Sequence, residues 1–243
     1  ELFGYFKSFG NMHKAKLQSA LEVLPETFES NISIIDWGCG QGFASMVSLE
    51  KYGNANISRI ILIEPSELAI KRAALHCKKY CPEMPLKTIC KKLDNLTEND
   101  FNILQSDVTI HLFSNILDFD GYSQNHLIDL IEQTQVGENY FVCASPYIDP
   151  IKTERLESFM RHFENNNDSF KLLLDITNTK SLSDTFWCCN NTYTQGNVNH
   201  GQYSNCNDYN ECGCFKKWTR VIKVFKVNLQ ENYNSSICPN LKT

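Results

Sequence analysis

Short β-branched runs alternate with amphipathic helical segments along most of the chain. Apolar residues in the helical segments recur at spacings of three and four, as Leu17, Ala20, Leu21 and Leu24 do. We expect strands at 32–35, 58–63, 86–90, 108–113, 139–145, 170–176 and 218–227. We expect helices at 2–24, 43–53, 67–80, 98–104, 122–135 and 153–163. This alternation predicts a doubly wound α/β fold: a mostly parallel, seven-stranded sheet with helices on both faces.

The length of 243 residues fits one domain of this kind. We expect residues 1–30 to form an N-terminal helical lid and residues 31–176 to form the core. Residues 177–217 lack periodicity and predict a long irregular insertion, after which residues 218–228 return as the last strand. Because the chain begins with Glu1 rather than methionine, additional domains outside it stay an open alternative.

The charge balance of the chain is acidic. Lys and Arg number 23 against 28 Asp and Glu, and this net charge of −5 argues against a surface built mainly for a phosphate backbone. Nucleic acid stays possible as a partner through a local patch of Lys78, Lys79, Lys91 and Lys92. No apolar stretch approaches the roughly 20 residues that cross a bilayer, so we expect no membrane partner.

The cysteines indicate a reducing compartment. They number 11, an odd count, and several fall within the expected core elements, so we expect a cytoplasmic protein without a disulfide framework. A possible zinc set in the insertion is Cys188, Cys189, Cys206, Cys212 and Cys214. These residues lack the paired C-x-x-C spacing of structural zinc sites, so we expect free thiols and no metal.

The sharpest local signal is the segment IIDWGCGQG at residues 34–42. Asp36 ends an apolar strand, and Gly38, Gly40 and Gly42 follow at alternate positions before a helix. Glycines remove Cβ atoms where the backbone must turn beneath a ligand, and the helix N-terminus offers unpaired amides. A nucleotide-like cofactor is indicated. The pattern departs from G-x-G-x-x-G, which disfavours an NAD-dependent oxidoreductase.

With this acid and these glycines, the chain resembles the class I, Rossmann-like, S-adenosylmethionine (SAM) dependent methyltransferases. The resemblance covers residues 32–176 by element order and implies that these residues bind SAM. In that family the glycine loop, here Asp36, Gly38, Gly40 and Gly42, passes under the methionine part of the cofactor. The family also places an acid after the second strand, where it accepts hydrogen bonds from both ribose hydroxyls. Glu64 matches that position.

The resemblance implies further cofactor contacts. Leu93 and Asp94 follow the third strand, where family members often contact the adenine. Ser114 and Asn115 end the fourth strand, beside the transferred methyl group. Ile116 follows instead of the Pro-Pro pair of the DNA amino-methyltransferases, which disfavours that subfamily.

Residues near the methyl group are candidates for chemistry. If the acceptor is an amine or a hydroxyl, it also needs a base or a hydrogen-bond acceptor, for which Asn115, Asp118 and His13 are the candidates. Tyr5, Met12 and His13 could form part of a lid over the cofactor. His111 lies inside an apolar strand, and we interpret it as a hydrogen-bonded core residue.

The function favoured by these signals is methyl transfer from SAM to an acceptor that the sequence does not identify. RNA, protein and small molecules all stay open as acceptors. The main alternative is a SAM-binding, catalytically degenerate module that acts within a larger protein.

Overall fold

The computed structural model describes residues 2–53, 57–101, 108–147, 149–178 and 219–230. Its helices are α1 (Leu2–Leu21), α2 (Phe43–Tyr52), α3 (Glu67–Tyr80), α4 (Gln124–Thr134) and α5 (Pro150–Asn166). Its strands are β1 (Ile32–Trp37), β2 (Ile57–Ile63), β3 (Leu86–Ile89), β4 (Val108–Ser114), β5 (Gly137–Ser145), β6 (Lys171–Asn178) and β7 (Arg220–Leu229). The 3₁₀ turns are η1 (Leu93–Asn95) and η2 (Glu98–Asp100).

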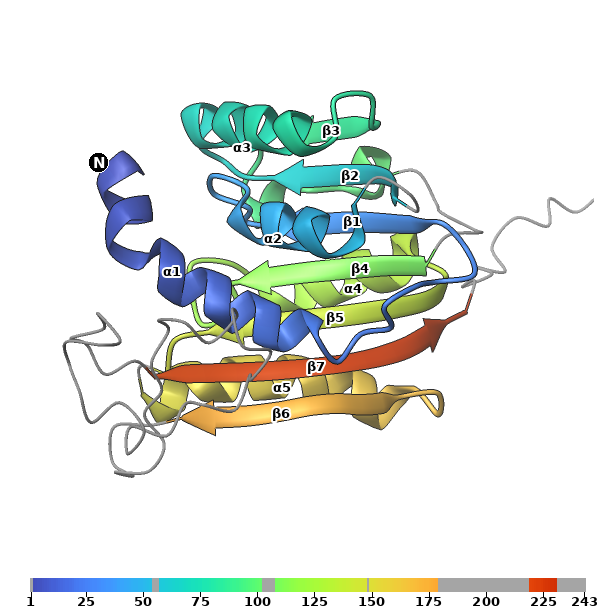
Figure 1. Ribbon diagram of the computed structural model, residues 1–243. Helices are drawn as coiled ribbons and strands as arrows, with labels where there is room; N and C mark the ends of the chain where they lie inside the picture. The colour runs from blue at the N-terminus through green and yellow to red at the C-terminus, as the bar shows by residue number, and fades with distance from the viewer. Residues whose placement is uncertain (1, 54–56, 102–107, 148, 179–218, 231–243) are drawn as a thin grey trace, which may run out of the picture.

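The strands form one sheet of seven in the order β3-β2-β1-β4-β5-β7-β6. The four pairings among β1 to β5 are parallel, whereas β7 is antiparallel to both β5 and β6. The expected α/β sheet of seven strands is therefore confirmed, and the sheet is mixed. Because β7 runs the other way, its first residue lies at the edge where β1, β2, β4 and β5 end (Figure 1).

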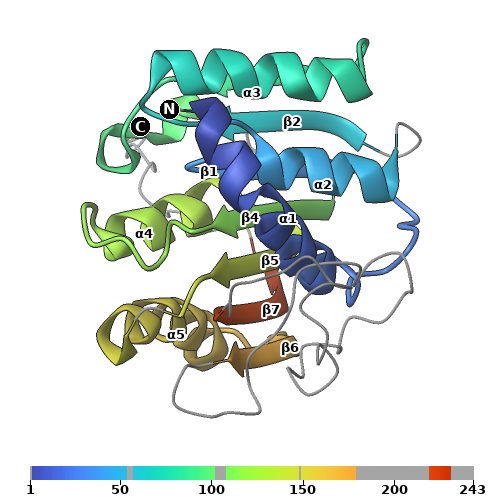
Figure 2. The same ribbon diagram turned by 60° about the vertical axis from the view of Figure 1, so that its left-hand side comes forward.

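Helices cover both faces of the sheet (Figures 1 and 2). On one face α1, α2 and α3 pack on alternate strand residues such as Ile34, Leu62 and Leu112. On the other face α4 and α5 pack on the intervening residues, including Ile35 and Phe113. This division follows from the period of two along a strand, and it explains why the central strands are apolar throughout.

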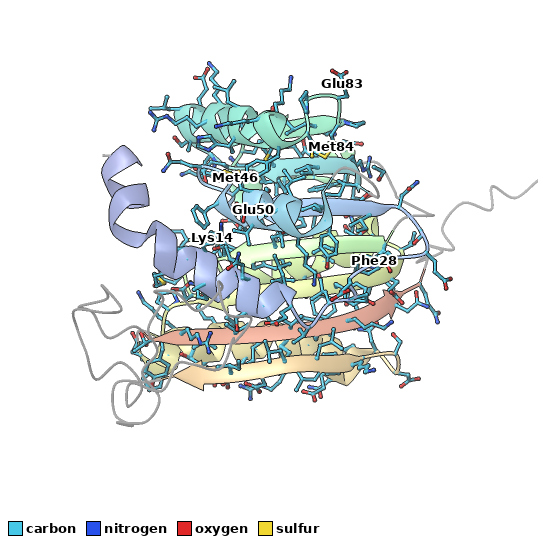
Figure 3. All side chains as sticks on the ribbon, in the orientation of Figure 1. Lys14, Phe28, Met46, Glu50, Glu83 and Met84 are labelled. Carbon is cyan, nitrogen blue, oxygen red and sulfur yellow. The ribbon has the colours of Figure 1, made fainter. Side chains whose placement is uncertain are left out.

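Helix α1 is tied to its neighbours by polar as well as apolar contacts. Lys14 of α1 forms an ion pair with Glu50 of α2 at 2.8 Å (Figure 3). The Lys51 ammonium donates to the carbonyl oxygens of Leu21 and Leu24, just where α1 ends. Helix α1 therefore has a fixed position across the sheet face, and its first turns extend past the edge at which β4 ends (Figure 1).

One expected helix is wrong. Residues 98–104 were expected to be helical, but over the described part a 3₁₀ turn ends at Asp100. Asp100 accepts a hydrogen bond from the backbone of Thr97, which closes a capping box around a single turn. Phe101 then continues in an extended conformation, and its side chain is buried in the core on the α4 face. Core packing of Phe101 thus outweighs helix propensity here.

Candidate functional site

Asp36 is the last residue but one of β1, and its side chain is almost completely buried. Its Oδ2 accepts hydrogen bonds from the backbone nitrogen of Ser45 at 3.2 Å and from its hydroxyl at 2.7 Å. Its Oδ1 is buried without a hydrogen-bond partner among the described residues. Burial raises the pKa of Asp36 to about 7, the nearby Glu64 charge adds to this, and the Ser45 hydrogen bonds oppose it. One acceptor oxygen is therefore available to a ligand.

The glycine loop turns through the left-handed region at each of its three glycines. A Cβ on Gly42 would lie 2.9 Å from the Cβ of Ala73 on α3, and φ at Gly42 is +78°. A Cβ on Gly38 would lie 2.9 Å from the side chain of Ile116. A Cβ on Gly40 would meet nothing within 4 Å. Two glycines thus allow close packing, whereas Gly40 borders open space above the loop.

Glu64 follows β2 and contacts the same loop. Its Oε2 accepts from the backbone nitrogen of Gly40 at 3.1 Å, and its Oε1 accepts from that of Ser66 at 2.9 Å. The side chain is half-buried. The parallel pairing of β1 with β2, in which Asp36 lies opposite Leu62, places both acids at one edge. The structure therefore brings together Asp36, the glycine loop and Glu64, as the sequence predicts.

The two residues expected near adenine differ in their surroundings. Leu93 is buried in the core on the α4 face. Asp94 is exposed, and its Oδ1 accepts from the backbone nitrogen of Ser123 at 2.8 Å, just before α4. Asp94 therefore supports the start of a helix in this structure.

Asn115 lies immediately after Ser114 at the end of β4. Its φ of +58° is in the left-handed region, which Asn tolerates better than most residues. Its backbone nitrogen donates to the Ala144 carbonyl at 2.9 Å. Its Oδ1 accepts from the Lys16 ammonium at 2.6 Å, and its Nδ2 lies 3.3 Å from Nδ1 of His13. Two residues of α1 therefore hold this side chain.

Asp118 belongs to the same region. Its Oδ1 accepts from the hydroxyl of Ser145, the last residue of β5, at 2.8 Å. Arg220, the first residue of β7, donates to the Ser19 hydroxyl of α1 at 3.2 Å. The three residues expected to act on the acceptor, His13, Asn115 and Asp118, thus lie at one edge of the sheet.

Sequence reasoning missed Lys16, which lies at the centre of this group and is completely buried. A signal for it exists. Lys16 is three residues after His13 and lies among the apolar positions Ala15, Leu17 and Ala20, where a helix faces the core. A charged residue on such a face is seldom buried without a polar partner.

His111 behaves as expected from the sequence. The indole nitrogen of Trp37 donates to its Nδ1 at 3.1 Å, and its Nε2 lies 3.0 Å from Oδ1 of Asn139. Burial lowers the pKa of His111 to about 4, so the ring is neutral and can accept at one nitrogen while donating at the other. His111 is therefore a core residue whose two ring nitrogens both have hydrogen-bond partners.

The remaining expectations concern the lid, the insertion and the membrane. Met12 and His13 are buried on α1, whereas the side chain of Tyr5 and residues 179–218, with the insertion cysteines, lie outside the described residues. The described part of the chain contains no cluster of three or more His, Cys, Asp or Glu side chains suited to a metal ion. Within the same part, no helix is both long and apolar enough to span a bilayer.

Comparison with known proteins identifies the fold. No family model matches the chain. One curated protein, the carboxy-S-adenosyl-L-methionine synthase of Pseudoalteromonas atlantica, is 36% identical over 67 residues, which are 28% of this chain and 27% of that protein. The chain therefore matches about a quarter of that relative's length.

Solved structures match over nearly the whole chain. A putative methyltransferase solved with the Haloferax volcanii Trm112 activator has a TM-score of 0.54 at 14% identity, covering 93% of this chain and 95% of its own. A putative methyltransferase from Pseudomonas syringae has a TM-score of 0.52 at 12% identity, covering 88% and 98%. The geranyl diphosphate C-methyltransferase of Streptomyces coelicolor, solved with S-adenosyl-L-homocysteine, has a TM-score of 0.51 at 10% identity, covering 91% and 80%. The resemblance expected from the glycine motif is thus confirmed: the chain has the fold of the class I SAM-dependent methyltransferases.

Proposed function

We propose that this protein binds SAM above the glycine loop and transfers its methyl group to an acceptor. The observation that carries the proposal is the contact between Glu64 and the backbone of Gly40. It joins the two parts of the sequence that match the methyltransferase pattern, and it places a two-oxygen acceptor beside an open glycine turn. A nucleoside with a vicinal diol fits that arrangement.

The residues present fit the cofactor on three counts. Asp36 has a buried oxygen without a partner, which suits a donor group from the amino-acid part of the cofactor. The space at Gly40 admits a ligand close to the backbone. Each Glu64 oxygen keeps a second lone pair beyond its present hydrogen bond, so it can also accept from a hydroxyl.

When bound, SAM supplies an electrophilic methyl group on its sulfonium. The chain has to hold the acceptor in line with that group, and orientation of this kind can contribute several kcal/mol. We assign cofactor contacts to Leu93, Asp94, Ser114 and Asn115 as well. We assign contacts with the acceptor to Asn115, Asp118 and His13, which α1 and the ends of β4 and β5 bring together.

The acceptor stays open among RNA, protein and small molecules. We further propose one doubly wound, mostly parallel domain in the cytoplasm. The insertion expected at residues 177–217 then begins later than expected, because β6 continues to Asn178. The described cysteines Cys39, Cys77, Cys81, Cys90 and Cys143 are free thiols, which supports a reducing location.

Calorimetry with SAM on the full chain tests the proposal. Glu64→Ala removes both carboxylate oxygens and is expected to weaken SAM binding at least tenfold, as is Asp36→Ala. Glu67→Ala is the matched control, because Glu67 is an exposed acid whose side chain pairs with Lys71. Unchanged SAM affinity in both site variants would overturn the assignment.

Transfer of tritium from methyl-labelled SAM into a cell extract then separates an enzyme from a binding module. An enzyme incorporates label, and Glu64→Ala reduces the incorporation. If the wild-type protein binds SAM in calorimetry but incorporates no label, the result would support the degenerate module instead.

A further inference from the structure

Lys16 is a charged side chain that connects the three residues assigned to the acceptor. Its ammonium donates to Oδ1 of Asn115 at 2.6 Å. It shares one face of α1 with His13, which contacts the other end of the same carboxamide. The charge of Asp118 favours the protonated form of Lys16 and so raises its pKa. Residues distant in the sequence thus meet around a lysine with no exposed surface.

The contacts fix which way the Asn115 carboxamide points. A lysine ammonium only donates, so the atom facing Lys16 is the oxygen and the atom facing His13 is the nitrogen. Burial, with a further contribution from the Lys16 charge, lowers the pKa of His13 to about 3, so its ring is neutral and Nδ1 can accept from Asn115. The backbone of Asn115 is held as well, by its bond to the Ala144 carbonyl.

Several charged groups face Lys16 from the elements packed around it. Burial lowers the pKa of Lys16 to about 7, Asp118 opposes this shift, and Arg220 of β7 adds to it. His13 on its own helix is neutral in this range. Arg220 keeps its charge, since burial lowers its pKa only to about 10. Lys16 therefore changes charge near neutral pH beside an asparagine at the end of β4.

We propose that Lys16 is a positioning residue for the methyl acceptor: through its hydrogen bond it holds the Asn115 carboxamide in the orientation that the acceptor meets. This rests on the methyltransferase function proposed above and gives it a residue that the sequence motif does not contain. The protonated lysine makes a charge-assisted bond, which is stronger than the bond of a neutral amine. Loss of the proton loosens the carboxamide.

The side-chain amide of Asn115 reports this directly in nitrogen-15 NMR of the full chain. We expect its two N–H signals to titrate with a midpoint near pH 7 in the wild type and not to titrate in Lys16→Met. Lys14→Met is the matched control, since Lys14 lies on the same helix in an ion pair with Glu50, and it should keep the titration. If Lys16→Met does not fold, Lys16→Arg gives the same test, because a guanidinium keeps its proton throughout this range.

Methyl transfer tests the role. Because Asn115 is also assigned to the cofactor, labelled SAM is kept at saturation. With a cell extract as acceptor, Lys16→Met should then lower the rate at pH 7 about tenfold. The double variant Lys16→Met/Asn115→Ala should lose no more than the worse single variant, because residues that act as a unit are not additive. If the two substitutions acted independently, their fold-reductions in rate would multiply in the double variant instead.

The outcomes separate the inference from the proposed function. If SAM binds and label is transferred, but the amide does not titrate or Lys16→Met behaves as Lys14→Met does, the role of Lys16 is refuted alone. If wild-type protein binds no SAM, the proposed function fails and the role of Lys16 fails with it.

Discussion

Two regions lie at the same edge of the sheet but present different kinds of atoms. One is the glycine loop after β1, and the other is the polar group beneath α1, which consists of His13, Lys16, Asn115, Asp118 and Arg220. The loop offers backbone amides and two carboxylates, Asp36 and Glu64, beside a turn without side chains. The group beneath α1 consists of side chains, with Lys16 and Arg220 as buried cations. Burial raises the pKa of the acid in the first region and lowers that of the base in the second.

Under the proposed function, this difference lets one sheet edge serve two ligands. A backbone site needs no particular side chains, so it suits a cofactor that always has the same shape. A side-chain site changes with each substitution, so it suits an acceptor that differs between related proteins. We therefore expect substitutions in the loop to affect folding and cofactor binding, and those beneath α1 to affect transfer and its pH dependence.

Gly42→Ala should have the largest effect on stability. The change forces an alanine into a φ of +78° and places its Cβ 2.9 Å from Ala73 Cβ and 3.0 Å from Ala73 Cα. Left-handed strain and the overpacked contact together should lower the free energy of unfolding by about 3 kcal/mol. Urea denaturation of the full chain measures this.

Gly40→Ala is the matched control for that prediction. It has the same left-handed backbone but open space at its Cβ, so it should cost about 1 kcal/mol. Its methyl group would occupy the space assigned to the cofactor, so SAM affinity should fall. Equal destabilisation by both alanines would show that the approach of α3 is not what requires glycine at Gly42.

The glycine loop was predictable because its signal is local. Asp36 and the glycines lie within one short segment, residues 36–42, and Glu64 directly follows the next strand, which pairs in parallel with β1. Once the alternation of strands and helices is recognised, the parallel pairing itself brings both acids to one edge.

The group beneath α1 was predictable only in part. Lys16 and Asn115 are 99 residues apart, and Ser19 and Arg220 are 201 apart, so no spacing in the sequence indicates their contact. The position of α1 across β5 and β7 decides it. In the same way, the contact of Asp94 with the start of α4 depends on how η1 packs, which no local pattern specifies.

Asp36→Asn should change how stability depends on pH. The pKa of Asp36 rises from 3.8 in the unfolded chain to about 7 when folded, so the folded state binds more protons between these values. Wild-type stability should therefore fall as pH rises through this window, and Asn removes that fall. Relative to wild type, the variant should gain about 2 kcal/mol between pH 5 and pH 7. Denaturation at both pH values measures the difference, and a constant offset would contradict the buried, titrating acid.

Lys16→Met should change the pH dependence of stability in the opposite direction to Asp36→Asn, in the adjacent pH window, and by a smaller amount. The pKa of Lys16 falls from 10.5 in the unfolded chain to about 7 when folded, so here the unfolded state binds more protons. Wild-type stability should rise with pH in this window, by about 1.5 kcal/mol between pH 7 and pH 8.5, and the variant should lack that rise. Lys14→Met should keep it, because Lys14 is partly exposed and pairs with Glu50 of α2 at 2.8 Å. If Lys16→Met kept the rise as well, the lysine would not titrate near neutral pH. Opposite pKa shifts would then no longer distinguish the two regions.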